Sequence, residues 1–171
     1  MNTQQPCNKN AQLTIEREFS APKELVFSAF ATAEALAEWW GPPGMPITVV
    51  KFDFRPNGVF HYKTDMMGQT AWGRFVYGQI ESPDLLEFTS SFSDEHCGIT
   101  RAPFNDKFPL EIFNHLELSE KDGNTLITLT GHPVNASDEE LAFYASMAEG
   151  MQQGFAGTFA QLDNYLSKRL K

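Results

Sequence analysis

The fold is decided by residues 137–168, which read SDEELAFYASMAEGMQQGFAGTFAQLDNYLSK. The opening Ser-Asp-Glu-Glu is a capping box, in which the serine and the second glutamate can each satisfy a free backbone amide. Apolar residues then recur at three- and four-residue steps, so they share one helix face. These residues are Leu141, Tyr144, Ala148, Met151, Phe155, Phe159, Leu162 and Leu166. The stretch predicts one long C-terminal helix, running to about Lys168, whose apolar face needs a partner.

The chain before this helix is rich in strand signals. Strands are predicted at 46–55, 58–65, 69–81, 85–93, 109–119 and 124–132. Turn residues such as those at 56–58 and 122–124 separate them, and links this short join antiparallel neighbours. A further strand at 12–19 and two short helices precede them, and a longer loop at 94–108 interrupts the series.

These elements predict an α+β protein. Seven antiparallel strands must bury one face, and the C-terminal helix is the only predicted element large enough to cover it. The expected architecture is a curved sheet of about seven strands wrapped around that helix. The 171 residues fit one domain at 12–171, preceded by a polar segment at 1–11 that we predict to be disordered.

Charge and composition exclude several classes of partner. The chain carries 13 Lys and Arg against 22 Asp and Glu, a net charge of -9. Nucleic acids and anionic membranes attract clustered basic residues, so neither is an expected partner. There is no apolar run of about 20 residues to span a bilayer, and no secretory leader. With only two cysteines, Cys7 and Cys97, we expect a cytoplasmic protein with free thiols.

Four motifs occur in order along the chain. They are Glu38-Trp39-Trp40-Gly41-Pro42, the turn at 52–58, the hairpin at 72–77 and 80–88, and Gly154-Phe155-Ala156-Gly157-Thr158-Phe159 with Leu162. Together they resemble bacterial proteins related to the heat-shock-protein-90 ATPase activator. Asn57 stands where that family's turn usually has glycine, and Phe155 where its helix usually has tryptophan.

The resemblance covers about 12–168 and implies the helix-grip fold of the START-like (SRPBCC) superfamily. That superfamily also contains lipid carriers and polyketide cyclases or aromatases. Homodimerisation is an expectation at the level of the family. The resemblance does not imply a particular reaction, because one fold serves many functions.

A curved sheet wrapped around one helix often leaves an apolar cavity, the usual form of a small-molecule site. Strand alternation places Phe60 and Tyr62 on the inner face, opposite His61. The strand at 69–81 is apolar on both faces, so its orientation stays open. The residues predicted to bind a ligand are Trp39, Trp40, Phe60, Tyr62, Trp72, Ser90, Phe92, Asn114, Met151 and Phe155. The aromatic members could equally interdigitate as a dense core.

Ser90 and Asn114 are the informative pair in this set. Both occupy inward strand positions among apolar neighbours, where an unpaired polar group costs about 1–3 kcal/mol. Either each bonds locally, or both meet a ligand or water inside the cavity. Three glycines in the last helix, Gly150, Gly154 and Gly157, predict that another element passes very close or that the helix bends there.

No catalytic residue, metal or cofactor is predicted. His61 and His115 are expected on the solvated face of the sheet. The four histidines and Cys97 lack metal-ligand spacing, and the chain has no nucleophile elbow, P-loop or dinucleotide motif.

The sequence favours a protein that binds a small hydrophobic or aromatic molecule between sheet and helix. One alternative is a cyclase- or aromatase-like enzyme using Tyr62, Asp53 and Arg55. The other is a co-chaperone-like module that docks a chaperone through its sheet face or through Phe104 and Phe108 in the long loop.

Overall fold

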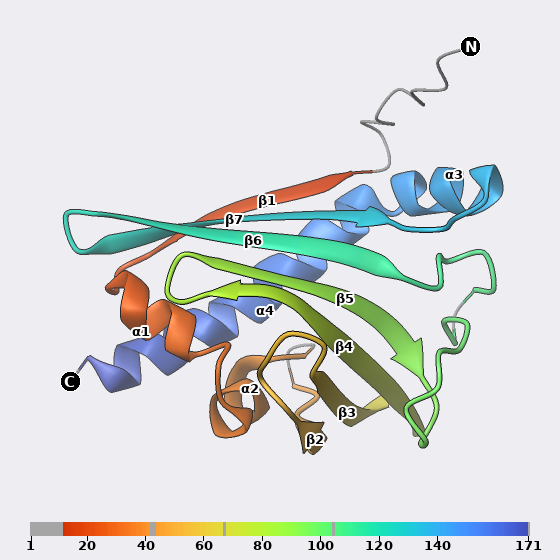
Figure 1. The fold of residues 1–171 in the computed structure, drawn as a ribbon, viewed down its shortest axis with the longest axis horizontal. Coiled ribbons are helices and arrows are strands. Elements are labelled where there is room, and N and C mark those ends of the chain that lie inside the picture. Colours follow the sequence, from red (N-terminus) through yellow and green to blue (C-terminus); the bar gives the residue numbers. More distant parts are fainter. Residues whose placement is uncertain (1–11, 42–43, 67, 104, 171) are drawn as a thin grey trace, which may run out of the picture.

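The computed structural model describes residues 12–41, 44–66, 68–103 and 105–170, without the Met66 side chain (Figure 1). The predicted disorder at 1–11 and the proposed docking residue Phe104 lie outside this part of the chain. Seven antiparallel strands form one curved sheet in the order β1-β7-β6-β5-β4-β3-β2. The strands are β1 Leu13–Phe19, β2 Ile47–Phe52, β3 Val59–Met66, β4 Gln69–Glu81, β5 Leu85–Ser93, β6 Ile112–Lys121 and β7 Asn124–Pro133. The helices are α1 Lys23–Ser28, α2 Ala33–Trp39, α3 Asp138–Ser146 and α4 Ala148–Arg169.

The α+β class and the seven-stranded sheet covered by a C-terminal helix are confirmed. Strands β4 and β5 have the predicted bounds, whereas the predicted 109–119 begins later, at Ile112. Pro109 has no amide to donate to a strand ladder, which disfavours a strand at that position. Strand β2 ends at Phe52 because the next residues form a tight turn, in which a Cβ on Gly58 would lie 2.1 Å from the Asp53 carbonyl oxygen.

The prediction of one unbroken C-terminal helix is wrong, because Met147 separates α3 from α4. The capping box at Ser137 and Glu140 is present as predicted. Tyr144 of α3 is buried with Leu13 and Ile112 in a small cluster at the end of the sheet. Figure 1 shows α3 beside that end while α4 runs diagonally across the sheet. The break allows α3 and α4 to pack in these two directions.

Helix α4 is held against the sheet and against α2. Phe159 packs edge-on to Phe19 with ring centroids 6.0 Å apart, and both side chains are buried. The Gly41 carbonyl, just after α2, accepts hydrogen bonds from Thr158 Oγ1 at 3.1 Å and from Gln161 Nε2 at 2.8 Å. These two bonds fix the end of α2, and with it Trp40, relative to α4.

Candidate ligand-binding site

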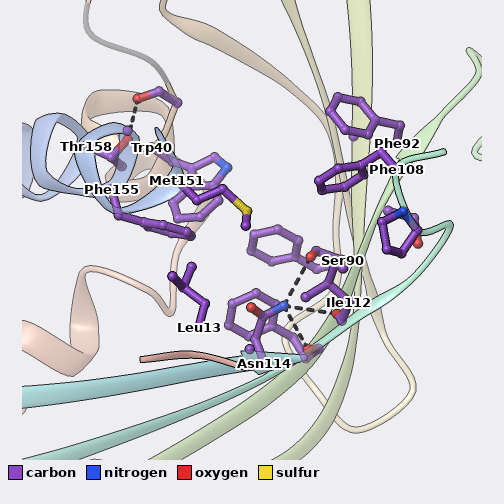
Figure 2. Close-up of a pocket in the computed structure, with 18 of the residues that line it drawn as sticks. Leu13, Trp40, Ser90, Phe92, Phe108, Ile112, Asn114, Met151, Phe155 and Thr158 are labelled. Atoms are coloured by element: carbon purple, nitrogen blue, oxygen red, sulfur yellow. Dashed lines mark hydrogen bonds between the residues drawn. The ribbon is translucent and has the colours of Figure 1, made fainter. Parts of the chain in front are cut away.

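A cavity of about 590 Å³ lies between the inner face of the sheet and α4 (Figure 2). Strands β3 to β7, the loop before β6 and helices α3 and α4 all contribute to it. Every described side chain in its lining is apolar or neutral and polar. The lining is Leu13, Trp40, Gly41, Tyr62, Thr64, Ala71, Trp72, Gly73, Phe75, Phe88, Ser90, Ser91, Phe92, Phe108, Pro109, Ile112, Asn114, Leu129, Gly131, Tyr144, Met147, Gly150, Met151, Gly154, Phe155 and Thr158.

Aromatic rings in contact build one wall of the cavity. Trp40 meets Phe75 edge-on at 5.2 Å and Phe155 at 6.4 Å between ring centroids. Tyr62 crosses the neighbouring strand at Gly73, where an added Cβ would lie 2.6 Å from the tyrosine hydroxyl oxygen. The glycine therefore provides the room that the Tyr62 ring occupies. Edge-to-face contacts of this kind hold the wall in one arrangement.

The opposite wall is formed by α4, where glycines leave space. A Cβ added to Gly150 or Gly154 would meet nothing within 4 Å, and both residues line the cavity. The predicted close approach of another element is therefore wrong at these two positions. Each glycine in a helix costs about 1 kcal/mol relative to alanine. The two glycines leave open volume in the cavity beside Met151 and Phe155.

The main polar feature of the cavity is Asn114, which is 6% exposed. Its Nδ2 atom donates to the Ser90 Oγ at 3.1 Å, to the Ile112 carbonyl at 3.1 Å and to the Phe88 carbonyl at 3.3 Å. Figure 2 shows these bonds on one side of the cavity. The sequence left open whether Ser90 and Asn114 bond locally or meet a ligand. The structure shows a local hydrogen bond between them, and both residues also border the cavity.

Phenols are protonated near neutral pH, and burial moves the pKa values of the two tyrosines in this site further above it. Burial raises the pKa of the Tyr144 hydroxyl to about 12. Burial also raises the pKa of Tyr62, and a hydrogen bond with the Trp40 side chain offsets part of that rise. Both groups are therefore neutral donors and acceptors near neutral pH. Tyr144 donates to the Gly131 carbonyl at 3.3 Å.

Eight of the ten predicted ligand-binding residues line the cavity: Trp40, Tyr62, Trp72, Ser90, Phe92, Asn114, Met151 and Phe155. Trp39 and Phe60 do not, and both are fully buried in the main core. The Trp39 Nε1 atom donates to the Ala29 carbonyl at 2.8 Å, which directs its ring toward α1. Phe60 is enclosed by Phe75 and other rings of the core.

The orientation of β4 is settled by its register with β3. Gly73 pairs with Tyr62 and Phe75 with Phe60, so Phe75 faces inward. The Trp72 ring stacks on His61 at 5.2 Å on the outer face, although Trp72 belongs to the lining.

His61 faces outward as predicted, but the expectation that it is solvated is wrong. Its side chain is 3% exposed, and its Nε2 atom lies 3.1 Å from the Asp94 carbonyl oxygen. The Asp94 carboxylate accepts hydrogen bonds from the His96 and Gly98 amides, which lower its pKa and hold the loop over His61. The loop after β5 therefore covers this part of the outer face.

The other acid–base candidates lie away from the cavity. Arg55 Nε donates to the Asp53 carboxylate at 2.8 Å within the turn between β2 and β3, and neither residue lines the cavity. His115 lies on the outer face between Glu87, at 2.7 Å, and Glu117, at 2.9 Å. These contacts lie at the surface of the sheet and become ion pairs when His115 is protonated.

Sequence reasoning missed several lining residues. Phe88 and Ile112 had inward strand positions, so alternation alone was enough to include them. Leu13, Phe108 and Tyr144 meet at the far end of the sheet, and only the fold brings these distant segments together.

Two features are absent from the part of the chain that the structure describes. None of the helices among the described residues has the length and hydrophobicity that a membrane crossing needs. The same part of the chain contains no group of three or more His, Cys, Asp or Glu residues positioned to hold a metal ion.

The fold and its cavity define a helix-grip protein of the START-like, SRPBCC type. Residues 20–167 match the sequence profile described as activator of Hsp90 ATPase homolog 1-like protein, and the chain belongs to this family. No curated protein matches the sequence.

Solved structures agree with this assignment. Protein Ms6760 from Mycobacterium smegmatis is 26% identical, with a TM-score of 0.75 over 94% of this chain and 93% of its own. A protein from Arthrobacter aurescens is 30% identical, with a TM-score of 0.76 over 93% of this chain and 87% of its own. The AHSA1 protein from Silicibacter pomeroyi is 19% identical and shares the fold, with a TM-score of 0.69 over 93% and 99% of the two chains.

Proposed function

We propose that this protein binds a small hydrophobic or aromatic molecule in the cavity between the sheet and α4. The observation that carries the proposal is a cavity of about 590 Å³ whose described side chains are all apolar or neutral and polar. Small-molecule sites have this volume and this composition, with a few polar groups to orient the ligand. Cytoplasmic location and homodimerisation stay predictions from the sequence.

The glycines of α4 give this proposal its second support. A protein under selection only for a stable core has a reason to fill the space beside Gly150 and Gly154, because alanine favours the helix. Keeping two glycines at the wall of a cavity sacrifices stability and preserves volume. Binding accounts for that combination, and it also explains why Met147 and Met151, which adapt their shape, lie beside it.

Calorimetric titration with naphthalene, an uncharged aromatic probe, tests the proposal. We expect saturable binding of one molecule per chain. Gly154→Leu should weaken it by about tenfold, equal to 1.4 kcal/mol, because the new side chain enters the cavity. Gln153→Leu is the matched control, since Gln153 is exposed on the same helix and does not line the cavity. The proposal fails if naphthalene does not saturate the protein, or if the two variants behave alike.

A further inference from the structure

We infer that the cavity selects an uncharged ligand whose apolar body ends in a hydroxyl or amide group, one that donates and accepts a hydrogen bond at Asn114 and Ser90. The inference rests on the proposed function and names the ligand class for the same site. Asn114 and Ser90 together form what we call the polar corner of the cavity. Three observations support the inference: the fixed orientation of the Asn114 amide, the unused proton of Ser90 and the neutrality of the surrounding wall.

The orientation of the Asn114 amide is fixed by its neighbours. Three oxygen acceptors surround one of its two terminal atoms, and only a nitrogen with hydrogens can satisfy them. The Oδ1 atom must therefore occupy the other position, where no described group donates a hydrogen bond to it. The residue is more than nine-tenths buried and borders the cavity. Its oxygen is an acceptor without a donor, which a ligand can supply.

Ser90 provides the complementary donor. Its Oγ accepts from Asn114, and its own proton has no acceptor among the described residues. Ser90 lines the cavity beside Asn114 (Figure 2). The corner thus presents one open acceptor and one open donor. A hydroxyl or amide on the ligand satisfies both, whereas an ether or a hydrocarbon leaves the Asn114 oxygen unpaired.

A third polar group lies next to this corner. A Cβ added to Gly131 would lie 3.1 Å from Asn114 Oδ1 and 3.4 Å from the Tyr144 hydroxyl oxygen. Both oxygens therefore lie close to Gly131, and all three residues belong to the cavity lining. Tyr144 uses its proton on the Gly131 carbonyl, so its oxygen retains lone pairs that can accept from a second ligand hydrogen, as an amide NH₂ would provide.

The neutrality of the wall decides the charge of the ligand. No described lining residue is an acid, a base or a histidine, so a carboxylate or ammonium group would enter without a counter-ion. An ion that loses its water without gaining a partner is strongly disfavoured. Since the phenols of Tyr62 and Tyr144 also stay protonated, the corner has no charge to offer. The ligand head is therefore polar but uncharged.

Calorimetry with four probes of one aromatic skeleton tests the inference on the unmodified protein. The probes are naphthalene, 2-naphthol, 2-methoxynaphthalene and 2-naphthoate, at neutral pH. We expect 2-naphthol to bind about tenfold more tightly than 2-methoxynaphthalene, because only the hydroxyl can donate to Asn114 Oδ1. The charged 2-naphthoate should bind more weakly than naphthalene. Equal affinities for 2-naphthol and 2-methoxynaphthalene, or tightest binding of 2-naphthoate, would overturn the inference.

Two variants locate the effect at the polar corner. Asn114→Leu should bring 2-naphthol and 2-methoxynaphthalene to similar affinities while naphthalene still binds. Ser90→Ala, which leaves two carbonyls to hold the Asn114 amide, should weaken 2-naphthol several-fold and should affect naphthalene less. A preference for 2-naphthol that survives in Asn114→Leu contradicts the inference. Binding of naphthalene without selectivity refutes the inference and leaves the proposed function standing, whereas failure of all four probes to bind refutes both.

Discussion

At the residue scale, two neighbouring tryptophans show how the chain divides core from site. Trp39 is fully buried, and its indole nitrogen is bonded to the Ala29 carbonyl. Trp40, one residue later, is half-buried, packs on Phe75 and Phe155 and lines the cavity. Because α2 ends at Trp39, the backbone turns to an extended conformation at Trp40 and directs the two rings differently.

This difference predicts opposite effects of the same substitution. Trp39→Ala should lower the free energy of unfolding by about 3–5 kcal/mol, because it empties a filled core site. Trp40→Ala should lower the free energy of unfolding less than Trp39→Ala does, and it should weaken naphthalene binding more than Trp39→Ala does. Urea denaturation and calorimetric titration measure the two quantities. A larger stability loss for Trp40→Ala than for Trp39→Ala would show that the core and the site have been assigned the wrong way round.

Sequence reasoning at this scale predicts faces but not depth. Alternation placed Tyr62, Ser90 and Asn114 correctly on the inner face, and all three line the cavity. It could not distinguish Phe60, which is sealed beneath other rings, from Tyr62, two residues later. Depth depends on which distant segment covers a position. The burial of His61 shows the same limit, because the loop from Asp94 covers it.

At the element scale, α4 combines a packing role with a binding role. Its C-terminal half carries Phe159 and Leu162 into the core, whereas its N-terminal half carries Gly150, Met151 and Gly154 past the cavity. Where these halves join, Thr158 Oγ1 donates a hydrogen bond to the Gly41 carbonyl. This bond connects the glycine-containing motif of α4 to the Trp-Trp-Gly motif that follows α2. The sequence predicted the helix but not its break at Met147, because apolar spacing continues through the break.

Substitution of Gly154 in α4 by alanine tests whether this glycine lowers the stability of the fold. Gly154→Ala should raise the free energy of unfolding by about 1 kcal/mol, since alanine is the better helix former and its Cβ meets nothing within 4 Å. Thermal denaturation should show an increase in Tm of about 2–4 °C. An unchanged or lower Tm would mean that the backbone at this position requires glycine for a reason other than open space.

Contacts of His115 on the outer face of strands β5 and β6 predict that the free energy of unfolding depends on pH. Hydrogen bonds with Glu117 and Glu87 raise the pKa of His115 above its ordinary value of 6.5. Protonated His115 therefore stabilises the fold, fully at pH values below the unfolded-state pKa and progressively less as the pH rises through the folded-state pKa. The difference in unfolding free energy between the unmodified protein and His115→Gln should be larger at about pH 6 than at about pH 8.

Urea titrations of both proteins at the two pH values measure this difference, and NMR titration of the imidazole gives the folded-state pKa directly. A difference that grows as the pH rises would contradict the assignment, because it would require the neutral imidazole to be the stabilising form.

At the scale of the whole molecule, the cavity lies between two separate hydrophobic cores. The larger core joins α1, α2 and α4 to the sheet, and the smaller core gathers Leu13, Ile112 and Tyr144 at the other end. Phe155 packs against both. The curved sheet spans the two cores while α4 crosses it diagonally (Figure 1), and residues of both cores line the cavity. The sequence predicted sheet and helix, but the extent of this cavity depends on their curvature and crossing.

Native mass spectrometry of protein purified from its own cells tests the central claim most directly. We predict a chain that carries one small molecule, which denaturation releases and which proves to be an uncharged compound with an apolar body. Gly154→Leu protein prepared in the same way should carry less of it than Gln153→Leu protein. A chain that is always empty, and that also fails to take up naphthalene, would contradict the claim that this cavity is a binding site.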